Sequence, residues 1–259
     1  MSDHSFRKMT TAIIVPARLA SNRFPQKLLH AINGTPLILW TARRIRAEAP
    51  EYPLFFAVDG PRLKEVLETD GFDAVLTDPD LPSGTDRIAA ANAHVGAARV
   101  INVQGDEPMV TGAQIRMLDN LLGEGIDMAT LGTPLHSGKD FRDPNHVKMV
   151  RTRTGRALYF SRAPIPYIRD AGGCYDSLLA GPDDVLIHLG LYAYTAAFLA
   201  AFASLPPSPL ERLERLEMLR ALENGYSIAA GITPEGLIEI DTPENVAEFA
   251  SALTQRSIP

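Results

Sequence analysis

Residues 11–27 of this 259-residue chain read TAIIVPARLASNRFPQK, a short β-branched run that leads directly into a loop rich in basic side chains. Continuous apolar runs of this length are typical of strands that are covered on both faces, as in a parallel sheet. Similar runs follow at LFFAV (54–58), VINV (100–103) and MATL (128–131). The sequence therefore predicts an α/β fold with a mixed, mostly parallel sheet.

Helix signals lie between these runs, so strand and helix alternate up to about residue 131. Such alternation indicates a doubly wound arrangement, in which ligands bind at the carboxyl ends of the strands. We read helix starts at Thr35-Pro36, at Thr111 with Gln114 and at Thr242-Pro243, and helix ends at Gly71 and Gly225.

From about residue 133 to residue 190 the pattern loosens, with proline, glycine and charged residues interspersed. The chain has no repeat, low-complexity tract or long linker to separate this stretch from the rest. We expect a single enzymatic domain over residues 1–259, with residues 133–190 as an inserted lobe at a subunit interface.

Composition excludes several classes of function. The net charge of −6 does not suit a protein that binds the phosphate backbone of nucleic acids. The single cysteine, Cys174, can form neither an internal disulfide nor a cysteine-based zinc site, which fits a reducing compartment. The first residues are polar, and no apolar run approaches the roughly 18 residues that span a bilayer. We expect a cytoplasmic protein with neither nucleic acid nor a membrane as partner.

The loop after the first predicted strand carries three cations, Arg18, Arg23 and Lys27. Guanidinium groups bind phosphate oxygens in pairs and an ammonium adds a point charge, so this loop is a candidate polyphosphate site. An ordinary solvated basic loop is the alternative. The chain has no Walker A loop and no GxGxxG motif, so any triphosphate would be bound by side chains.

Two carboxylates stand where predicted strands end. In VINVQGDEPMV (100–110), Asp106 follows a buried run, and Asp241 follows LIEI in the same way. A carboxylate at the end of a strand is well placed to hold Mg²⁺ on a nucleotide. The alternatives are a turn aspartate that caps the next helix at Asp106, and an N-cap of the last helix at Asp241.

Three further segments have ordinary structural readings when taken alone. DLPSGTDR (80–87) offers Ser83 and Arg87, but it also fits a capped helix start. His188 lies in the apolar segment VLIHLGLYAY, where a core histidine is the usual reading. The helix expected from Glu211, ERLERLEMLRALEN, alternates leucine with charges, which favours a solvated face of i,i+4 pairs.

Taken together and in order, these segments resemble the 3-deoxy-manno-octulosonate (Kdo) cytidylyltransferases. The resemblance spans nearly the whole chain through IIVPARLASNRFP, SGTDR, NVQGDEP, LYFSRAPIP, HLGLYAY, SPLERLERLEMLR and IDTPENV. It implies a nucleotide-diphospho-sugar transferase fold of Rossmann-like type, usually a homodimer, that acts on CTP and an acidic 2-keto sugar with Mg²⁺.

The resemblance also implies roles for individual residues. CTP would be bound by Pro16, Ala17, Arg18, Arg23, Lys27, Ser83, Arg87 and Asp106, and Mg²⁺ by Asp106 and Asp241. The sugar would be bound by Gln104, Arg162, His188, Tyr192 and Glu217, partly from the inserted lobe. Arg18, Lys27, Asp106 and Asp241 would form the catalytic group. The expected reaction transfers CMP from CTP to the anomeric hydroxyl of Kdo, for lipopolysaccharide synthesis, and releases pyrophosphate.

Three positions depart from the family pattern. Gln26 replaces a common glycine, so we expect a different backbone conformation before Lys27. Met218 and Thr195 replace a glutamine and an arginine, which leaves 8-amino-Kdo and sialic-acid-like sugars open as substrates. Two other classes are a dehydrogenase, which lacks its glycine motif here, and a silent nucleotide- or sugar-binding protein on the same scaffold.

Overall fold

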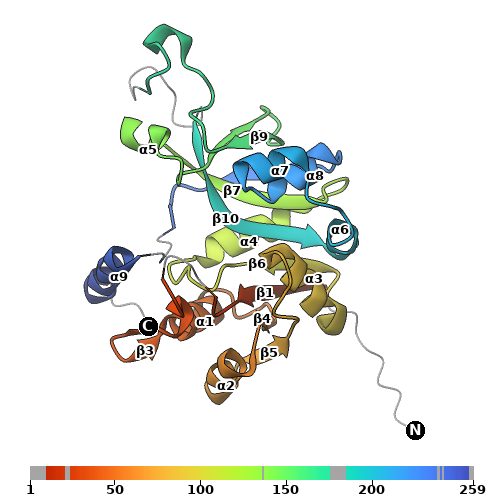
Figure 1. Cartoon of the computed structure of the whole chain (residues 1–259), viewed down its shortest axis with the longest axis vertical. Helices are drawn as coiled ribbons and strands as arrows, with labels where there is room; N and C mark the ends of the chain where they lie inside the picture. Colours follow the sequence, from red (N-terminus) through yellow and green to blue (C-terminus); the bar gives the residue numbers. More distant parts are fainter. Residues whose placement is uncertain are drawn as a thin grey trace. The chain divides into compact units, whose positions relative to one another are not determined.

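A computed structural model describes residues 10–20, 24–135, 137–175, 185–237, 240 and 242–256 (Figure 1). The chain forms two compact units. Unit 1 comprises residues 1–116, 195–203 and 237–259, and unit 2 comprises residues 117–194 and 204–236. Both units combine helices with strands, so the predicted α/β class is confirmed. The inserted lobe over residues 133–190 stays a prediction.

The sheet of unit 1 is parallel, in the strand order β6-β1-β4-β5. Its strands are β1 (Thr11–Ala17), β4 (Leu54–Val58), β5 (Asp73–Leu76) and β6 (Arg99–Asn102). The register pairs Ala17 with Val58, so the carboxyl ends of β1 and β4 lie side by side. The apolar runs from which three of these strands were predicted are largely buried, as a sheet covered on both faces requires.

Helices and a small hairpin complete unit 1. Helix α3 packs on β1 and α2 packs on β5. In the C-terminal segment, Phe249 of α9 meets Trp40 of α1 edge to face, with ring centroids 6.0 Å apart. The elements are η1 (Lys27–Leu29), β2 (Ala31–Ile32), β3 (Thr35–Pro36), α1 (Leu37–Glu48), α2 (Pro61–Thr69), α3 (Gly84–Val95), α6 (Ala196–Phe202) and α9 (Pro243–Arg256), while α4 (Gly112–Leu121) runs on into unit 2.

Two of the three predicted helix starts are confirmed. Thr111 and Gln114 exchange backbone-to-side-chain hydrogen bonds of 3.0 and 3.3 Å ahead of α4. Thr242 accepts a 3.4 Å bond from the backbone of Asn245 at the start of α9. The start at Thr35-Pro36 is wrong, because both residues pair with β2 and α1 begins at Leu37.

Unit 2 is built on a mixed sheet. Strand β11 (Ile228–Ile232) runs parallel to β7 (Met128–Pro134), and β10 (Leu186–Thr195) runs antiparallel to β7. Strand β8 (Lys148–Arg151) lies between β10 and β9 (Ala157–Ser161). The remaining elements are α5 (Gly138–Arg142), η2 (Arg169–Ala171), α7 (Pro209–Glu214) and α8 (Met218–Glu223).

The single helix expected from Glu211 is wrong in two respects. Arg215 has a φ of 56°, a left-handed conformation that ends α7 before α8 begins. Glu211 and Arg220 are buried rather than solvated. Leucine spacing alone could not show this break, because both short helices keep the same apolar period.

Among the described residues, no helix is both long enough and apolar enough to cross a membrane.

Candidate active site

The site in unit 1 begins where β1 and β6 end. Pro16 and Ala17, at the end of β1, are buried. A Cβ atom on Gly105, just after β6, would lie 3.4 Å from the Pro16 carbonyl oxygen and 3.0 Å from Ile38. Thr41 of α1 donates a 2.9 Å hydrogen bond to the Gly105 carbonyl. Glycine therefore lets the turn that carries Asp106 approach the start of the basic loop.

Asp106 and Lys27, far apart in sequence, form an ion pair in this unit. Their side chains are 13% and 15% exposed, so the pair is largely withdrawn from water. The alternative role for Asp106, a cap on the next helix, is not what the structure shows, because Thr111 and Gln114 cap α4. The structure thus brings together a strand-end carboxylate and a cation of the basic loop.

Gln26 precedes Lys27 with a φ of 56°, in the left-handed region. The expectation that this loop differs in backbone conformation from that of relatives with glycine here stays a prediction. The left-handed region is unfavourable for a residue with a Cβ but accessible to it. The Gln26 side chain also accepts a 2.8 Å hydrogen bond from Arg62, a contact that glycine cannot make.

The C-terminal segment meets the same turn. The backbone N–H of Ile240 donates a 3.1 Å hydrogen bond to the carbonyl oxygen of Asp106. Asp241, the other predicted metal ligand, and Arg23 of the basic loop lie outside the described residues. Arg18 is described and exposed, at the end of β1.

The third predicted segment is anchored by its own contacts. Ser83 caps α3, where it accepts a 3.1 Å bond from the Asp86 backbone and donates a 2.6 Å bond to its carboxylate. Arg87 is only 3% exposed and donates to the Thr77 hydroxyl at 2.6 Å and to two nearby carbonyls. Burial lowers the pKa of Arg87, and the negative charge of Asp59 opposes that shift. The capped helix start is therefore present, and nucleotide binding by Ser83 and Arg87 stays a prediction.

Asp59 is a further strand-end carboxylate beside the basic loop, which the sequence analysis did not single out. It directly follows β4, and its Oδ2 accepts a 2.9 Å hydrogen bond from the backbone N–H of Leu19, next to Arg18. The signal was present, since LFFAV runs straight into Asp59 just as VINV leads to Asp106.

In unit 2, His188 and Tyr192 lie on β10 with their ring centroids 5.4 Å apart. Burial lowers the pKa of His188 to about 3, so the imidazole is neutral near pH 7. Thr130 Oγ1 lies 3.0 Å from His188 Nε2 and 2.8 Å from the carbonyl oxygen of Leu191. A neutral imidazole has one donor and one acceptor nitrogen, so His188 can contribute either to a hydrogen bond.

Arg162, predicted to bind the sugar, is held by protein carbonyls. Its Nε donates to the Glu214 backbone oxygen at 2.7 Å and its Nη1 to that of Pro144 at 2.9 Å. Glu217 is half-buried at the start of α8. In unit 1, Gln104 donates to Asn102 at 3.4 Å. The sugar-binding roles of these residues stay predictions.

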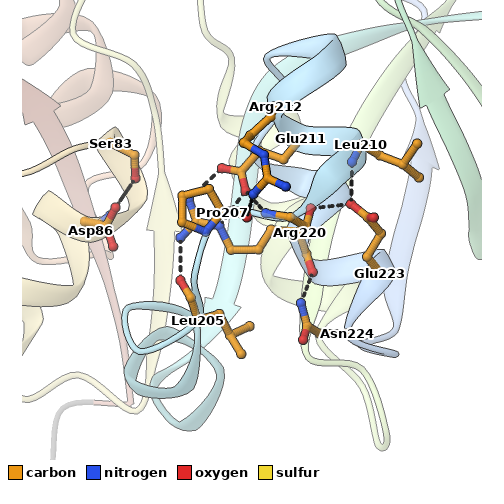
Figure 2. A network of polar contacts seen from close by, with 11 residues as sticks. Ser83, Asp86, Leu205, Pro207, Leu210, Glu211, Arg212, Arg220, Glu223 and Asn224 are labelled. Carbon is orange, nitrogen blue, oxygen red and sulfur yellow. Dashed lines mark hydrogen bonds and ion pairs between the residues drawn. The ribbon is translucent and has the colours of Figure 1, made fainter.

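Figure 2 shows a dense polar network in unit 2. Arg220 donates to Glu211 through Nε at 2.8 Å and Nη2 at 2.5 Å, with the side chains 4% and 11% exposed. Glu211 also accepts a 3.0 Å bond from the Ser208 backbone. Glu223 accepts from the Ser208 hydroxyl and the Leu210 backbone. This network ties α7 to α8 and has the character of a structural element.

The resemblance in sequence implies a metal ion, for which carboxylates of the described residues are the candidate ligands. The described residues contain no group of three or more histidine, cysteine, aspartate or glutamate side chains that could hold a metal. Mg²⁺ does not need such a cage, because it is usually bound by one or two carboxylates, water and substrate phosphates. Asp106, beside the basic loop, is compatible with that mode.

A largely parallel sheet with a carboxylate and a cation paired beyond its strand ends fits a nucleotidyltransferase with a nucleotide-diphospho-sugar transferase fold. The sequence model of a family described as "Cytidylyltransferase" matches residues 12–228. Because the match covers most of the chain, this protein belongs to the cytidylyltransferase family.

Individual relatives agree with this assignment. A 3-deoxy-manno-octulosonate cytidylyltransferase of Xanthomonas campestris pv. campestris is 44% identical over 250 residues, 93% of this chain and 100% of the relative. An 8-amino-3,8-dideoxy-manno-octulosonate cytidylyltransferase of Shewanella halifaxensis is 42% identical, over 92% of this chain and 96% of its own. A solved CMP:2-keto-3-deoxy-manno-octonic acid synthetase complexed with CTP is 33% identical, with a TM-score of 0.86 over 95% of this chain and 99% of its own.

Proposed function

We propose that this enzyme transfers CMP from CTP to the anomeric hydroxyl of Kdo and releases pyrophosphate, as a step of lipopolysaccharide synthesis. The observation that carries the proposal is the Lys27–Asp106 pair at the strand ends, in a chain 44% identical to a Kdo cytidylyltransferase. In this proposal, the carboxylate and the cation of the pair lie beside the triphosphate of the bound nucleotide.

The nucleotide is assigned to the ends of the unit 1 strands. Arg18, Arg23 and Lys27 would bind the phosphates beside Pro16 and Ala17, while Ser83 and Arg87 would hold the cytosine. The exposed position of Arg18 leaves its guanidinium accessible to a ligand. Lys27 can exchange Asp106 for phosphate oxygens when CTP binds, because its ammonium is mounted on a flexible stem.

Asp106 and Asp241 would hold Mg²⁺. The hydrogen bond from Ile240 to the Asp106 carbonyl supports this pairing, since Ile240 is the neighbour of Asp241 in sequence. Thr242 occupies the N-cap position of α9, the role considered as the alternative for Asp241. When bound, the ion would neutralise phosphate charge and make the attacking hydroxyl more acidic.

The chemistry is a single displacement. The anomeric oxygen of the sugar attacks the α-phosphorus of CTP, the bond from that phosphorus to the bridging oxygen breaks, and pyrophosphate leaves with the bonding electrons. The hydroxyl proton passes to solvent. The protein contributes position and charge, with Arg18 and Lys27 stabilising the leaving group, and no covalent enzyme intermediate is needed.

The sugar is assigned to Gln104, Arg162, His188, Tyr192 and Glu217. His188 is neutral near pH 7, so it would exchange a hydrogen bond with a sugar hydroxyl rather than bind the carboxylate. Arg162 carries a permanent positive charge suited to the carboxylate, although protein carbonyls already engage two of its nitrogens.

We also propose a homodimer that works in the cytoplasm. Unit 2 exposes Leu158, Tyr167 and Leu213 by 60%, 71% and 80%, and an interface between subunits would cover such apolar side chains. Leu158 and Tyr167 belong to the proposed lobe over residues 133–190. The exposed free thiol of Cys174 suits a reducing compartment.

A pyrophosphate-release assay with CTP, Mg²⁺ and a panel of acidic sugars tests the reaction and the substrate together. We expect the highest kcat/KM with Kdo and lower values with 8-amino-Kdo and sialic acid. A preference for 8-amino-Kdo would contradict the assigned sugar but keep the chemistry. CTP binding with no pyrophosphate release from any sugar would contradict the reaction itself.

A further inference from the structure

Asp59 occupies an unusual position for a carboxylate. It follows β4 at the end that lies beside the basic loop, and β1 pairs with β4 through Ala17 and Val58. The backbone N–H of Asp59 donates a 3.2 Å bond to the Ala17 carbonyl, so the residue is fixed against the end of β1. A negative charge beside a predicted phosphate site repels the phosphates, and its presence there requires an explanation.

The contacts of Asp59 supply one. Its Oδ2 accepts a 2.9 Å hydrogen bond from Leu19, which fixes the peptide plane that immediately follows Arg18. Because that peptide sets the direction of the chain on leaving β1, the bond constrains where the Arg18 side chain starts.

The same carboxylate acts on Arg87. The charge of Asp59 favours the guanidinium of Arg87, which burial disfavours. Arg87 donates to Thr77, and the Thr77 hydroxyl and backbone N–H lie 2.9 Å from the Val58 carbonyl. Asp59 and Thr77, the residue that holds Arg87, therefore meet at the same end of β4.

The other carboxylate oxygen, Oδ1, is buried and meets no hydrogen-bond donor among the residues that the structure describes. A buried acceptor without a donor costs free energy, and folded proteins seldom keep one without a reason. Packing alone would favour an apolar side chain here, so the carboxylate is retained for what it does to its neighbours.

We propose that Asp59 is a positioning residue for the nucleotide, which holds the loop after Arg18 through the Leu19 N–H and sets this loop relative to Arg87. The proposal rests on the proposed function, since it assigns a role within the CTP site. Asp59 touches the loop and not the reacting atoms, and it is therefore not a catalytic residue.

The test compares Asp59→Ala with Asp59→Asn, and uses Asp73→Ala as the control. Asn keeps a carbonyl oxygen that can accept from Leu19, whereas Ala removes the acceptor. Asp73 is an exposed aspartate at the start of β5 in the same sheet. For each protein we would measure the CTP dissociation constant by calorimetry, and kcat and both KM values by pyrophosphate release.

We expect Asp59→Ala to raise the dissociation constant and KM for CTP about tenfold, through loss of preorganisation, with the sugar KM changed less than about twofold. Asp59→Asn should stay within about threefold of the wild type, and Asp73→Ala should match it. If Asp59→Ala does not fold, Asp59→Ser replaces it. Serine keeps a polar side chain that is too short to accept the hydrogen bond from Leu19.

Wild-type CTP affinity in the Ala or Ser variant would overturn the proposal. Equally weak CTP binding by Asp59→Asn and Asp59→Ala would also overturn it, because the hydrogen bond from Leu19 would then not be the cause. An equal rise of the KM values for CTP and for the sugar would overturn it as well. Calorimetry reads CTP binding without turnover. A wild-type protein that binds CTP but releases no pyrophosphate would therefore refute the proposed reaction while still deciding the role of Asp59.

Discussion

The end of unit 1 that we assign to the nucleotide, called the nucleotide end below, and the α7–α8 network of unit 2 use the same kinds of charged side chain in different ways. In the network, Glu211 accepts two bonds from Arg220 and one from Ser208, all within the fold. At the nucleotide end, Asp106 pairs with the ammonium of Lys27, and Asp59 keeps one oxygen without a donor among the described residues. The carboxylate of the network is held within the fold, whereas we assign Asp106 to ligand binding and Asp59 to positioning a loop.

Physical chemistry supports this distinction. A bidentate guanidinium–carboxylate contact fixes both partners, and removal of either leaves a buried charge. A lysine ammonium on a flexible stem can instead exchange a carboxylate for a phosphate without disturbing the backbone. The first pair should therefore control stability and the second should control chemistry.

The largest expected effect is on stability, in the network. Arg220→Met leaves the buried Glu211 carboxylate without its guanidinium and should lower the free energy of unfolding by about 3–5 kcal/mol. Turnover per folded molecule should stay within about threefold, because the network does not touch the reacting groups in our proposal. Urea unfolding and active-site-normalised kinetics measure the two effects.

Two controls sharpen this result. The double variant Arg220→Met with Glu211→Leu should regain most of the loss, since no charge is then left buried. Arg43→Met breaks the more exposed Arg43–Asp70 pair, with side chains 44% and 28% exposed, and should cost less than about 1 kcal/mol. Equal losses at Arg220 and Arg43 would refute the structural reading of the network.

The next effect is on chemistry, at the nucleotide end. Asp106→Ala should lower turnover by at least about a hundredfold, a barrier increase of about 2.7 kcal/mol or more, because the proposed metal ligand is lost. Asp73→Ala, in the same unit, should retain wild-type turnover. Pyrophosphate release per folded enzyme checks both, and near-normal turnover of the Asp106 variant would remove Asp106 from the mechanism.

A third effect concerns pH. His188 has a folded-state pKa of about 3, below its usual value, so the unfolded chain binds the extra proton first as the pH falls. The stability contributed by neutral His188 is complete above about pH 6.5 and is lost toward pH 3, with a loss of about 2 kcal/mol between pH 7 and pH 5.

Unfolding of His188→Gln at both pH values isolates this contribution. The wild type should lose about 2 kcal/mol more free energy of unfolding than His188→Gln between pH 7 and pH 5. His94→Gln, at an exposed histidine, should show the same pH dependence of unfolding as the wild type. Identical pH profiles for wild type and His188→Gln would show that His188 is not buried as a neutral group.

The smallest effect tests the backbone of the loop that carries Lys27. Gln26→Gly should raise the free energy of unfolding by up to about 1 kcal/mol, because glycine adopts a positive φ without a steric cost. Asn33→Gly, at a φ of 49°, should gain less, since asparagine tolerates this region. Denaturant unfolding compares them, and a marked loss of stability in Gln26→Gly would show that the Arg62 contact outweighs the backbone strain.

Much of the fold was predictable from local patterns. The runs at residues 11–15, 54–58 and 128–131 fall in strands, as does the run at 100–103 up to Asn102, and the caps at Thr111 and Thr242 are confirmed. The helix start predicted at Thr35 was wrong because Thr35 and Pro36 pair with Ala31–Ile32 and form strand β3 of a hairpin. Local sequence signals identify a helix or strand well. They do not show that another segment of the chain will pair with the same residues and form a different element.

The departures from the family pattern show the same limit. Thr195 reads as a missing sugar contact in the sequence, yet it caps α6 with a 3.1 Å bond from the Phe198 backbone. Met218 is buried at the start of α8. Both residues have structural roles that were not visible as motifs.

By itself the sequence determined the α/β class, the strand-end position of Asp106, the cations of the basic loop and membership of the cytidylyltransferases, because these depend on composition, period and motif order. The tertiary structure decided that Lys27 meets Asp106, that Asp59 holds the loop after Arg18, and that Glu211 and Arg220 are buried partners rather than a solvated face. Such pairings depend on strand order, register and helix breaks, which bring together residues that no local pattern connects.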